Sequence, residues 1–85
     1  MFRIIYAKRV NKDLRGISQI NLTRLKAAVE ELVDFPDIAS IKFLKNHSIA
    51  DYRMRVGDYR VLFDVDWERG EIQILKIGHR RNVYD

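Results

Sequence analysis

The sequence contains no cysteine, a single proline and only four glycines. Without cysteine the chain can form neither a disulfide bridge nor a thiolate metal site, so packing and secondary structure must supply its stability. Two histidines alone are too few for a structural zinc site, and we expect neither a metal nor a cofactor. No Pro-, Gly- or Ser-rich tract marks a linker, so we expect one domain, 1–85.

Long apolar runs are also missing. No segment approaches the roughly 18 apolar residues of a membrane span. Arg3, Lys8 and Arg9 interrupt the region where a secretory signal would carry its apolar core. We therefore expect a cytoplasmic protein with no membrane partner.

The sequence is rich in basic residues, with 16 Lys and Arg against 12 Asp and Glu and a formal net charge of +4. The excess is spread along the chain rather than gathered in a tail. Such a charge is compatible with a polyanionic partner such as nucleic acid, but it does not identify one. A binding site therefore depends on which faces the charges occupy.

Apolar periodicity predicts a strand and two helices in the first half of the chain. The segment Phe2–Tyr6 alternates as a strand with one core face does. The segment Lys8–Arg15 has helical apolar spacing and many basic residues. Asn21 is predicted as the N-cap of a longer helix that ends before Pro36. The short gap between the helices predicts an antiparallel helical hairpin.

After a loop through residues 38–49 the apolar period changes to two, which predicts three strands. Their predicted ranges are Tyr52–Val56, Tyr59–Val65 and Glu71–Ile77. The expected architecture is β-α-α-β-β-β, an α+β fold with the helical hairpin packed on a mainly antiparallel four-stranded sheet.

The pair Gly57-Asp58 is a two-residue hairpin turn with glycine first, the order that a type II′ turn requires. This turn places Arg55 directly opposite Arg60 and puts Arg53 on the same face, away from the predicted core. Like charges directly opposed across a strand pair are destabilising. An anionic group is therefore expected at this face.

Two kinds of anion can neutralise the arginines. One is a carboxylate of this chain, for which Asp58, Asp64 and Asp85 are the candidates. The other is a phosphate, which suits arginine because its planar fork can make two bonds to one phosphate.

The C-terminal segment adds four polar candidates directly after the last strand: His79, Arg80, Arg81 and Tyr84. Each also has a structural explanation: His79 as a surface histidine, Arg81 as a solvated charge and Tyr84 as a core aromatic. For Arg81 the structural explanation is preferred. Their joint position next to the arginines indicates a site.

The segments YRMRVGDYRVLF (52–63) and IGHRRNVY (77–84) together resemble the motifs of RelE-type toxins. The family pattern runs approximately Y-R-x-R-x-G-D-Y-R-hydrophobic and then hydrophobic-x-H-R-R-x-V-Y. A weaker likeness extends to the N-terminal strand, the basic helix and Leu44-Lys45, so the resemblance covers nearly the whole chain.

The resemblance implies a RelE-like microbial RNase fold and a toxin that cleaves mRNA, commonly on the ribosome, without a metal. The implied reaction is attack of the ribose 2′-OH on the adjacent phosphorus, which leaves a cyclic phosphate and a 5′-OH. The implied partners are mRNA, the ribosome and a cognate antitoxin that holds the toxin in a hetero-oligomer. The functional groups of the family map onto Arg53, Arg55, Arg60, Arg80 and Tyr84. We expect the catalytic residues to be Arg55, Arg60, His79, Arg80 and Tyr84, and the RNA-binding residues to be Lys45, Arg53, Arg55 and Arg81.

The best-known member carries lysines where this chain has Arg53 and Arg55. Arginine does not readily lose a proton, so neither residue is expected to be the general base. His79 and Tyr84 are the alternatives for proton transfer, and His47 is interpreted as a surface residue.

Two other functions remain open. A ParE-type toxin has the same fold but poisons DNA gyrase without cutting RNA, and an inactive family member would only bind its antitoxin. In each case an acidic amphipathic antitoxin segment is expected over the basic helix Lys8–Arg15 or over the arginines of the sheet.

Overall fold

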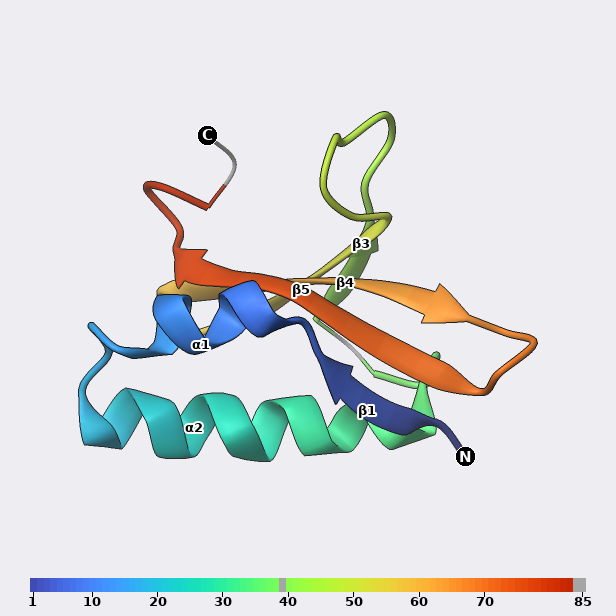
Figure 1. Cartoon of the computed structure of the whole chain (residues 1–85), viewed down its shortest axis with the longest axis horizontal. Helices are drawn as coiled ribbons and strands as arrows, with labels where there is room; N and C mark the ends of the chain where they lie inside the picture. Colours follow the sequence, from blue (N-terminus) through green and yellow to red (C-terminus); the bar gives the residue numbers. More distant parts are fainter. Residues whose placement is uncertain (39, 84–85) are drawn as a thin grey trace.

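The computed structural model describes residues 1–38 and 40–83. Figure 1 shows the helical part of the chain below a twisted sheet. The elements in chain order are β1 (Arg3–Tyr6), α1 (Lys8–Leu14), α2 (Gln19–Glu30), the 3-10 helix η1 (Glu31–Asp34), β2 (Ile41–Phe43), β3 (Tyr52–Val56), β4 (Tyr59–Asp66) and β5 (Glu71–His79). The strand order is β1-β5-β4-β3-β2, with β1 parallel to β5 and the other neighbours antiparallel. The α+β class is thus confirmed.

Over the described residues the sheet has five strands, where the sequence predicted four. The additional strand β2 lies inside the predicted loop and pairs antiparallel with β3. With three residues it is too short to show a period-two pattern, and it exists because β3 offers a free edge for pairing.

The start of α2 also differs from the prediction. Ser18, not Asn21, is the N-cap: its extended backbone lets the side-chain oxygen accept the amide of Asn21 at 3.4 Å. Asn21 lies in the first helical turn and donates its own side-chain amide to the same oxygen at 3.1 Å. The longer helix therefore begins three residues earlier than expected.

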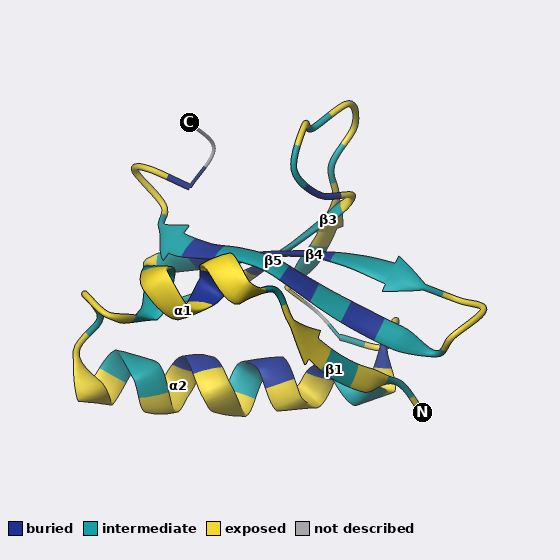
Figure 2. Cartoon of the chain, in the orientation of Figure 1, coloured by how far each residue is buried: buried dark blue, intermediate teal, exposed yellow. Residues whose placement is uncertain are grey.

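Both helices cover one face of the sheet, while the β2–β3 loop and the C-terminal segment rise from the other (Figure 1). The main core lies between helices and sheet, and buried positions alternate along β5 until its middle (Figure 2). The buried residues of this core are Val10, Leu25, Val29, Leu32, Phe35, Met54, Val61, Phe63, Ile72, Ile74 and Ile77. No helix among residues 1–38 and 40–83 is long and apolar enough to cross a membrane.

The predicted β3–β4 register is confirmed. Arg55 pairs with Arg60, and the flanking pairs match the sequence analysis. Of the two turn residues only Gly57 has a positive φ, +58°, which is the pattern of a type II′ turn. The turn therefore assigns every side chain of the hairpin to its face.

Helix α1 is tied to the sheet by a carboxylate. Strand β1 pairs with β5 only as far as Ile74, so the next part of this β5 edge has no strand partner within residues 1–38 and 40–83. There Asp13 of α1 accepts the backbone amide of the buried Ile77 at 3.1 Å. A helix side chain thus replaces the missing strand at that amide.

We expect Asp13→Ala to lower the free energy of unfolding by about 1 to 3 kcal/mol, because a buried backbone amide loses its acceptor. Asp13→Asn is the matched control, since its side-chain oxygen can still accept, and it should lose less. Urea unfolding followed by circular dichroism measures both. Equal losses in the two variants would show that the hydrogen bond is not what stabilises this edge.

Candidate functional site

We call the side of the sheet opposite the helices the arginine face, defined by Arg53, Arg55 and Arg60. Two neighbouring rows of paired residues carry its basic side chains. One row joins Arg55, Arg60 and Gly78 across β3, β4 and β5. The other joins Lys42, Arg53, Leu62 and Lys76 across β2 to β5. The structure thus opposes two pairs of like charges, Arg55 with Arg60 and Lys42 with Arg53.

The sequence analysis missed both lysines of this face. Lys42 lies on β2, which the sequence did not predict. Lys76 follows Leu75, which has no partner on β4 because the register shifts between Leu62 and Phe63. Such a β-bulge changes the alternation of side chains along a strand, and it cannot be read from periodicity alone.

The carboxylates proposed to neutralise the arginines are used elsewhere. Asp58 forms an ion pair with Arg80 at 3.8 Å. Asp64 accepts the backbone amide of Asp51 at 2.6 Å. Within the described part of the chain, Arg53 and Arg55 have no carboxylate at ion-pair distance. Asp85 lies outside the described residues.

Arg60 is the only charged or polar residue counted as buried among the residues described, with 9% of its surface exposed. Its Nη1 donates to the backbone oxygens of Gly57 at 3.0 Å and of Tyr59 at 2.9 Å. Arg60 thus closes the hairpin turn as well as carrying charge on the arginine face. Its replacement is expected to affect both the fold and any activity of the face.

A second, smaller core lies on the arginine face itself. Leu62 is fully buried beneath Ala50 of the β2–β3 loop and Val83 of the C-terminal segment. Val83 also packs on Gly78, where an added Cβ would lie 3.4 Å from the Val83 Cβ. The centre of the face is therefore covered, and its accessible cations lie to either side.

His79 holds the C-terminal turn rather than facing the arginines. It pairs with Tyr59, and the two rings meet edge to face with centroids 5.7 Å apart, so the imidazole lies on the helix side. Its Nδ1 accepts the backbone amide of Arg81 at 3.3 Å, and its carbonyl oxygen accepts the amides of Asn82 and Val83. The expectation that His79 lies beside the arginines is wrong for its ring.

The other predicted residues lie at the borders of the face. Arg80 and Arg81 are exposed in the C-terminal turn, and Lys45 is exposed in the β2–β3 loop. His47 is half-buried in the same loop, where its Nδ1 accepts the amide of Ile49 at 3.1 Å. Tyr84 lies outside the described residues. The structure thus brings Arg53 and Arg55 together with Lys42, and separates them from His79.

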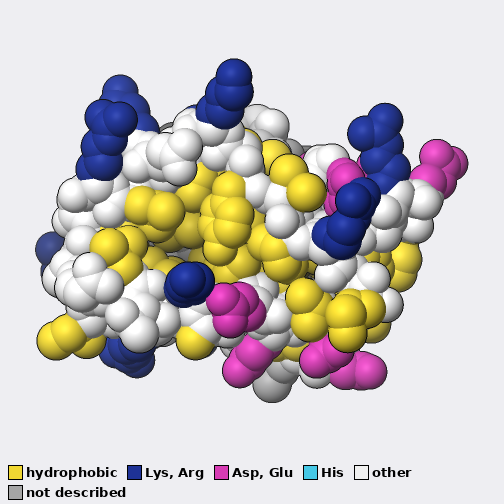
Figure 3. All heavy atoms as spheres, turned by 60° about the horizontal axis from the view of Figure 1, so that its bottom comes forward, with side chains coloured by type: hydrophobic (Ala, Val, Ile, Leu, Met, Phe, Trp, Pro, Cys, Tyr) yellow, Lys and Arg dark blue, Asp and Glu magenta, His cyan; other side chains and the backbone are white. Residues whose placement is uncertain are grey.

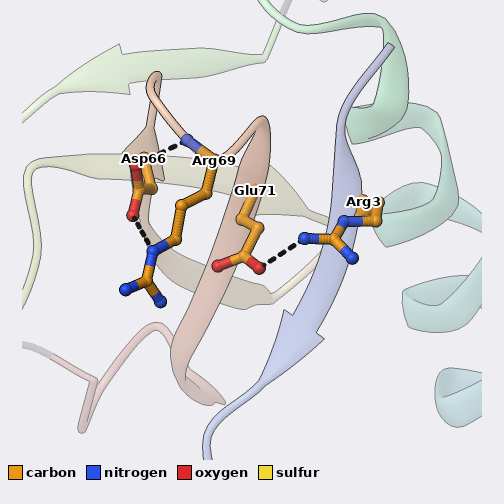
Figure 4. A network of polar contacts seen from close by, with 4 residues as sticks. All are labelled: Arg3, Asp66, Arg69 and Glu71. Atoms are coloured by element: carbon orange, nitrogen blue, oxygen red, sulfur yellow. Dashed lines mark hydrogen bonds and ion pairs between the residues drawn. The ribbon is translucent and has the colours of Figure 1, made fainter.

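The opposite end of the same face is acidic. Asp51 and Asp64 lie next to the two rows of basic residues. Burial raises the pKa of Asp64 above its ordinary value, and the nearby charge of Asp51 raises it further, although the hydrogen bond from the Asp51 amide lowers it. Further along, Glu71 pairs with Arg3 at 2.8 Å and Asp66 with Arg69 at 3.8 Å (Figure 4). The face is therefore polarised along its strands.

The helix side carries an apolar groove of about 370 Å³. Figure 3 shows apolar side chains gathered in the middle of this side. The groove is lined by Tyr6, Asn11, Leu14, Leu22, Leu25, Lys26, Val29 and Ile77. Burial, and secondarily the charge of Glu30, raises the pKa of the Tyr6 hydroxyl, which stays neutral.

Within the described residues, no three His, Asp or Glu side chains gather as a metal site would require. The fold and face together define a small α+β protein with a cationic sheet surface on one side and an apolar groove on the other.

Comparison with known proteins gives the family. The sequence model described as the ParE toxin of the type II toxin-antitoxin system parDE matches residues 4–84. Two proteins of Methanocaldococcus jannaschii are similar over nearly their full length. RelE1 is 37% identical over 98% of this chain and 94% of its own length. Toxin RelE3 is 32% identical over 98% of this chain and 96% of its own length.

A solved structure is also similar to this chain over nearly its whole length. A chain of the archaeal RelE-RelB complex from Pyrococcus horikoshii superposes with a TM-score of 0.77 at 29% identity, covering 96% of this chain and 98% of that one. The chain therefore belongs to the RelE/ParE toxin superfamily of type II toxin-antitoxin systems, which confirms the family that its sequence motifs indicated.

We expect His79→Ala to speed hydrogen exchange at the backbone amide of Arg81, because the amide loses its acceptor. His79→Asn should retain most of the protection, since an asparagine side chain can accept the amide two residues on. Exchange measured by NMR on folded protein tests both variants. An unchanged exchange rate in His79→Ala would show that the ring does not hold the turn.

Proposed function

We propose that this protein is the toxin of a type II toxin-antitoxin system and that it cleaves mRNA, in association with the ribosome, with the arginine face as its RNA site. The observation that carries the proposal is the group of cations on the arginine face, where Arg55 lies next to the opposed pair Lys42 and Arg53. Among the described residues neither Arg53 nor Arg55 has a carboxylate at ion-pair distance, and like charges held this close are unfavourable without an anion. The closeness of the chain to proteins named RelE toxins supports RNA as that anion.

The chemistry proposed is attack of a ribose 2′-OH on the neighbouring phosphorus. Its transition state carries extra negative charge on the phosphoryl oxygens, so fixed cations accelerate it. Arg55 is exposed and can reach a phosphate from its present position. Arg60, within the hairpin, and Arg80, in the C-terminal turn, add positive charge that stabilises the same transition state.

Proton transfer requires another group, because arginines stay protonated. His79 and Tyr84 are the two candidates from the sequence. The imidazole of His79 is directed to the helix side, where it contacts the Tyr59 ring. We therefore assign His79 a positioning role, through the turn that carries Arg80 and Arg81, and propose Tyr84 as the proton-transfer residue. Tyr84→Phe is the variant that tests this assignment.

The antitoxin is proposed to bind the helix side. The Pyrococcus horikoshii relative was solved as a RelE-RelB complex, and the present chain has an apolar groove that an amphipathic segment can fill. Lys26 lines the groove, and α1 adds Lys8, Arg9 and Lys12. An acidic amphipathic segment matches both the apolar lining and the charge.

Inhibition of DNA gyrase is the second candidate, because the family model that matches is that of ParE toxins. Two assays separate the functions. RNA 5′ ends mapped in a translating extract show new cuts within codons if the protein is a nuclease. Supercoiling by purified gyrase falls on addition of the protein if gyrase is the target. Loss of supercoiling without RNA cuts would overturn the nuclease proposal.

We expect Arg55→Gln to slow single-turnover RNA cleavage by about 10²- to 10³-fold, the usual effect of removing one donor to a developing anion. The fold should be unharmed, and the free energy of unfolding should rise by up to about 1 kcal/mol because an opposed like charge is gone. Cleavage rate and urea unfolding are measured on the same preparation.

Arg69→Gln is the matched control for this prediction, since it removes an exposed arginine from the β4–β5 turn, at the far end of the sheet from the β3–β4 turn. It should leave the cleavage rate unchanged. A wild-type rate in folded Arg55→Gln protein would remove the arginine face from the mechanism.

For the antitoxin, we expect Lys26→Glu to weaken binding of the protein encoded next to this chain at least tenfold and to reduce the salt dependence of association. Calorimetric titration measures the affinity. Arg69→Glu, with the same charge change at the far β4–β5 turn, is the control. If Arg55→Gln weakens binding and Lys26→Glu does not, the antitoxin lies on the arginine face instead.

A further inference from the structure

We propose that Lys42 is a substrate-binding residue, and that Lys42 and Arg53 together hold the RNA phosphate next to the one that reacts at Arg55. This inference rests on the proposed function, because it places a second phosphate of the same RNA strand. It assigns a role to strand β2, which belongs to none of the motifs that revealed the family.

The first observation is the pairing of Lys42 with Arg53. The two residues are directly opposed on β2 and β3, and both point to the arginine face. Neighbouring strands are about 4.8 Å apart, so both side chains can reach one phosphate. Lys42 is exposed and Arg53 half-buried, so the pair is open to a ligand on the β2 side.

The second observation is an unused donor. The Nε atom of Arg53 is buried and, within the described residues, has no hydrogen-bond partner. A buried donor without an acceptor is unfavourable. A small movement of the Arg53 side chain would bring this donor to a phosphate held between Arg53 and Lys42, whose oxygens would accept from the guanidinium group and lie against the ammonium group of the lysine.

The third observation is the boundary of the positive charge. Asp51 precedes β3 and lies two residues before Arg53, about 6.7 Å away in an extended chain. It brings a negative charge, and Asp64 lies beside it on β4. Two residues in the other direction lies Arg55. The RNA phosphates therefore fit between Arg53 and Arg55 and are repelled beyond Asp51, which leaves room for two adjacent phosphates on this part of the face.

The test uses binding of a short RNA whose reacting 2′-OH is replaced by hydrogen, so that affinity is measured without cleavage. We expect Lys42→Gln to weaken binding about tenfold and to reduce the slope of log affinity against log salt by about 0.7, the value for one phosphate contact on a single strand. Lys42→Arg should restore both. Asp51→Asn should act in the opposite direction and tighten binding.

A substrate change locates the contact. One methylphosphonate linkage, which carries no charge, is placed in turn on either side of the reacting phosphate. At one of these positions the wild-type protein should lose affinity, whereas Lys42→Gln should lose nothing further, because the lysine and the charge form one interaction. Additive losses at both positions would overturn the assignment.

The controls separate this inference from the proposed function. Arg69→Gln removes a cation from the far β4–β5 turn and should leave affinity and salt slope unchanged. Tight binding with the expected Lys42 effects but no cleavage of natural RNA would retain the phosphate site and overturn the nuclease. Cleavage by wild type with unchanged affinity in Lys42→Gln would retain the nuclease and overturn the Lys42 site. No RNA binding by wild type would overturn both.

Discussion

The register of the β3–β4 hairpin is the constraint on which the rest of the structure depends. Gly57 supplies the positive φ of the two-residue turn, and the turn fixes which residues face each other. A slip of β3 by one residue against β4 would turn Met54 out of the main core and bury Arg53 or Arg55 in its place. The apolar face that binds the helices and the cationic face opposite them are therefore two results of the same pairing.

The arginine face brings like charges together, which is unfavourable in itself. Two other features of the structure stabilise this face. Arg60 donates to two backbone oxygens of its own hairpin, so one of the opposed charges also stabilises the turn. Leu62, in the middle of the face, forms a second core with Ala50 and Val83. This second core fixes the β2–β3 loop and the C-terminal segment on the face, and these segments carry Lys45, Arg80 and Arg81.

The proposed antitoxin site and the proposed RNA site lie on opposite sides of strand β5. Ile77 of β5 lines the groove on the helix side, and its amide is bound by Asp13 of α1. Two residues later His79 begins the C-terminal turn over the arginine face. An antitoxin segment in the groove would thus contact the strand that positions Arg80. In this arrangement the inhibitor site and the RNA site are separate surfaces joined by the end of β5 and the turn that follows it.

The sequence by itself determined the features that local chemistry controls. The helical spacing, the period-two strands and the glycine-first turn predicted the fold class, the hairpin register and the shared face of Arg53, Arg55 and Arg60. Tertiary structure decided the rest. Strand β2 exists only through pairing with β3, and the bulge at Leu75 depends on the fit of β5 to β4. The burial of Arg60 and the direction of the His79 ring likewise depend on tertiary packing. Packing involves residues that are distant in sequence, so a local sequence pattern does not predict it.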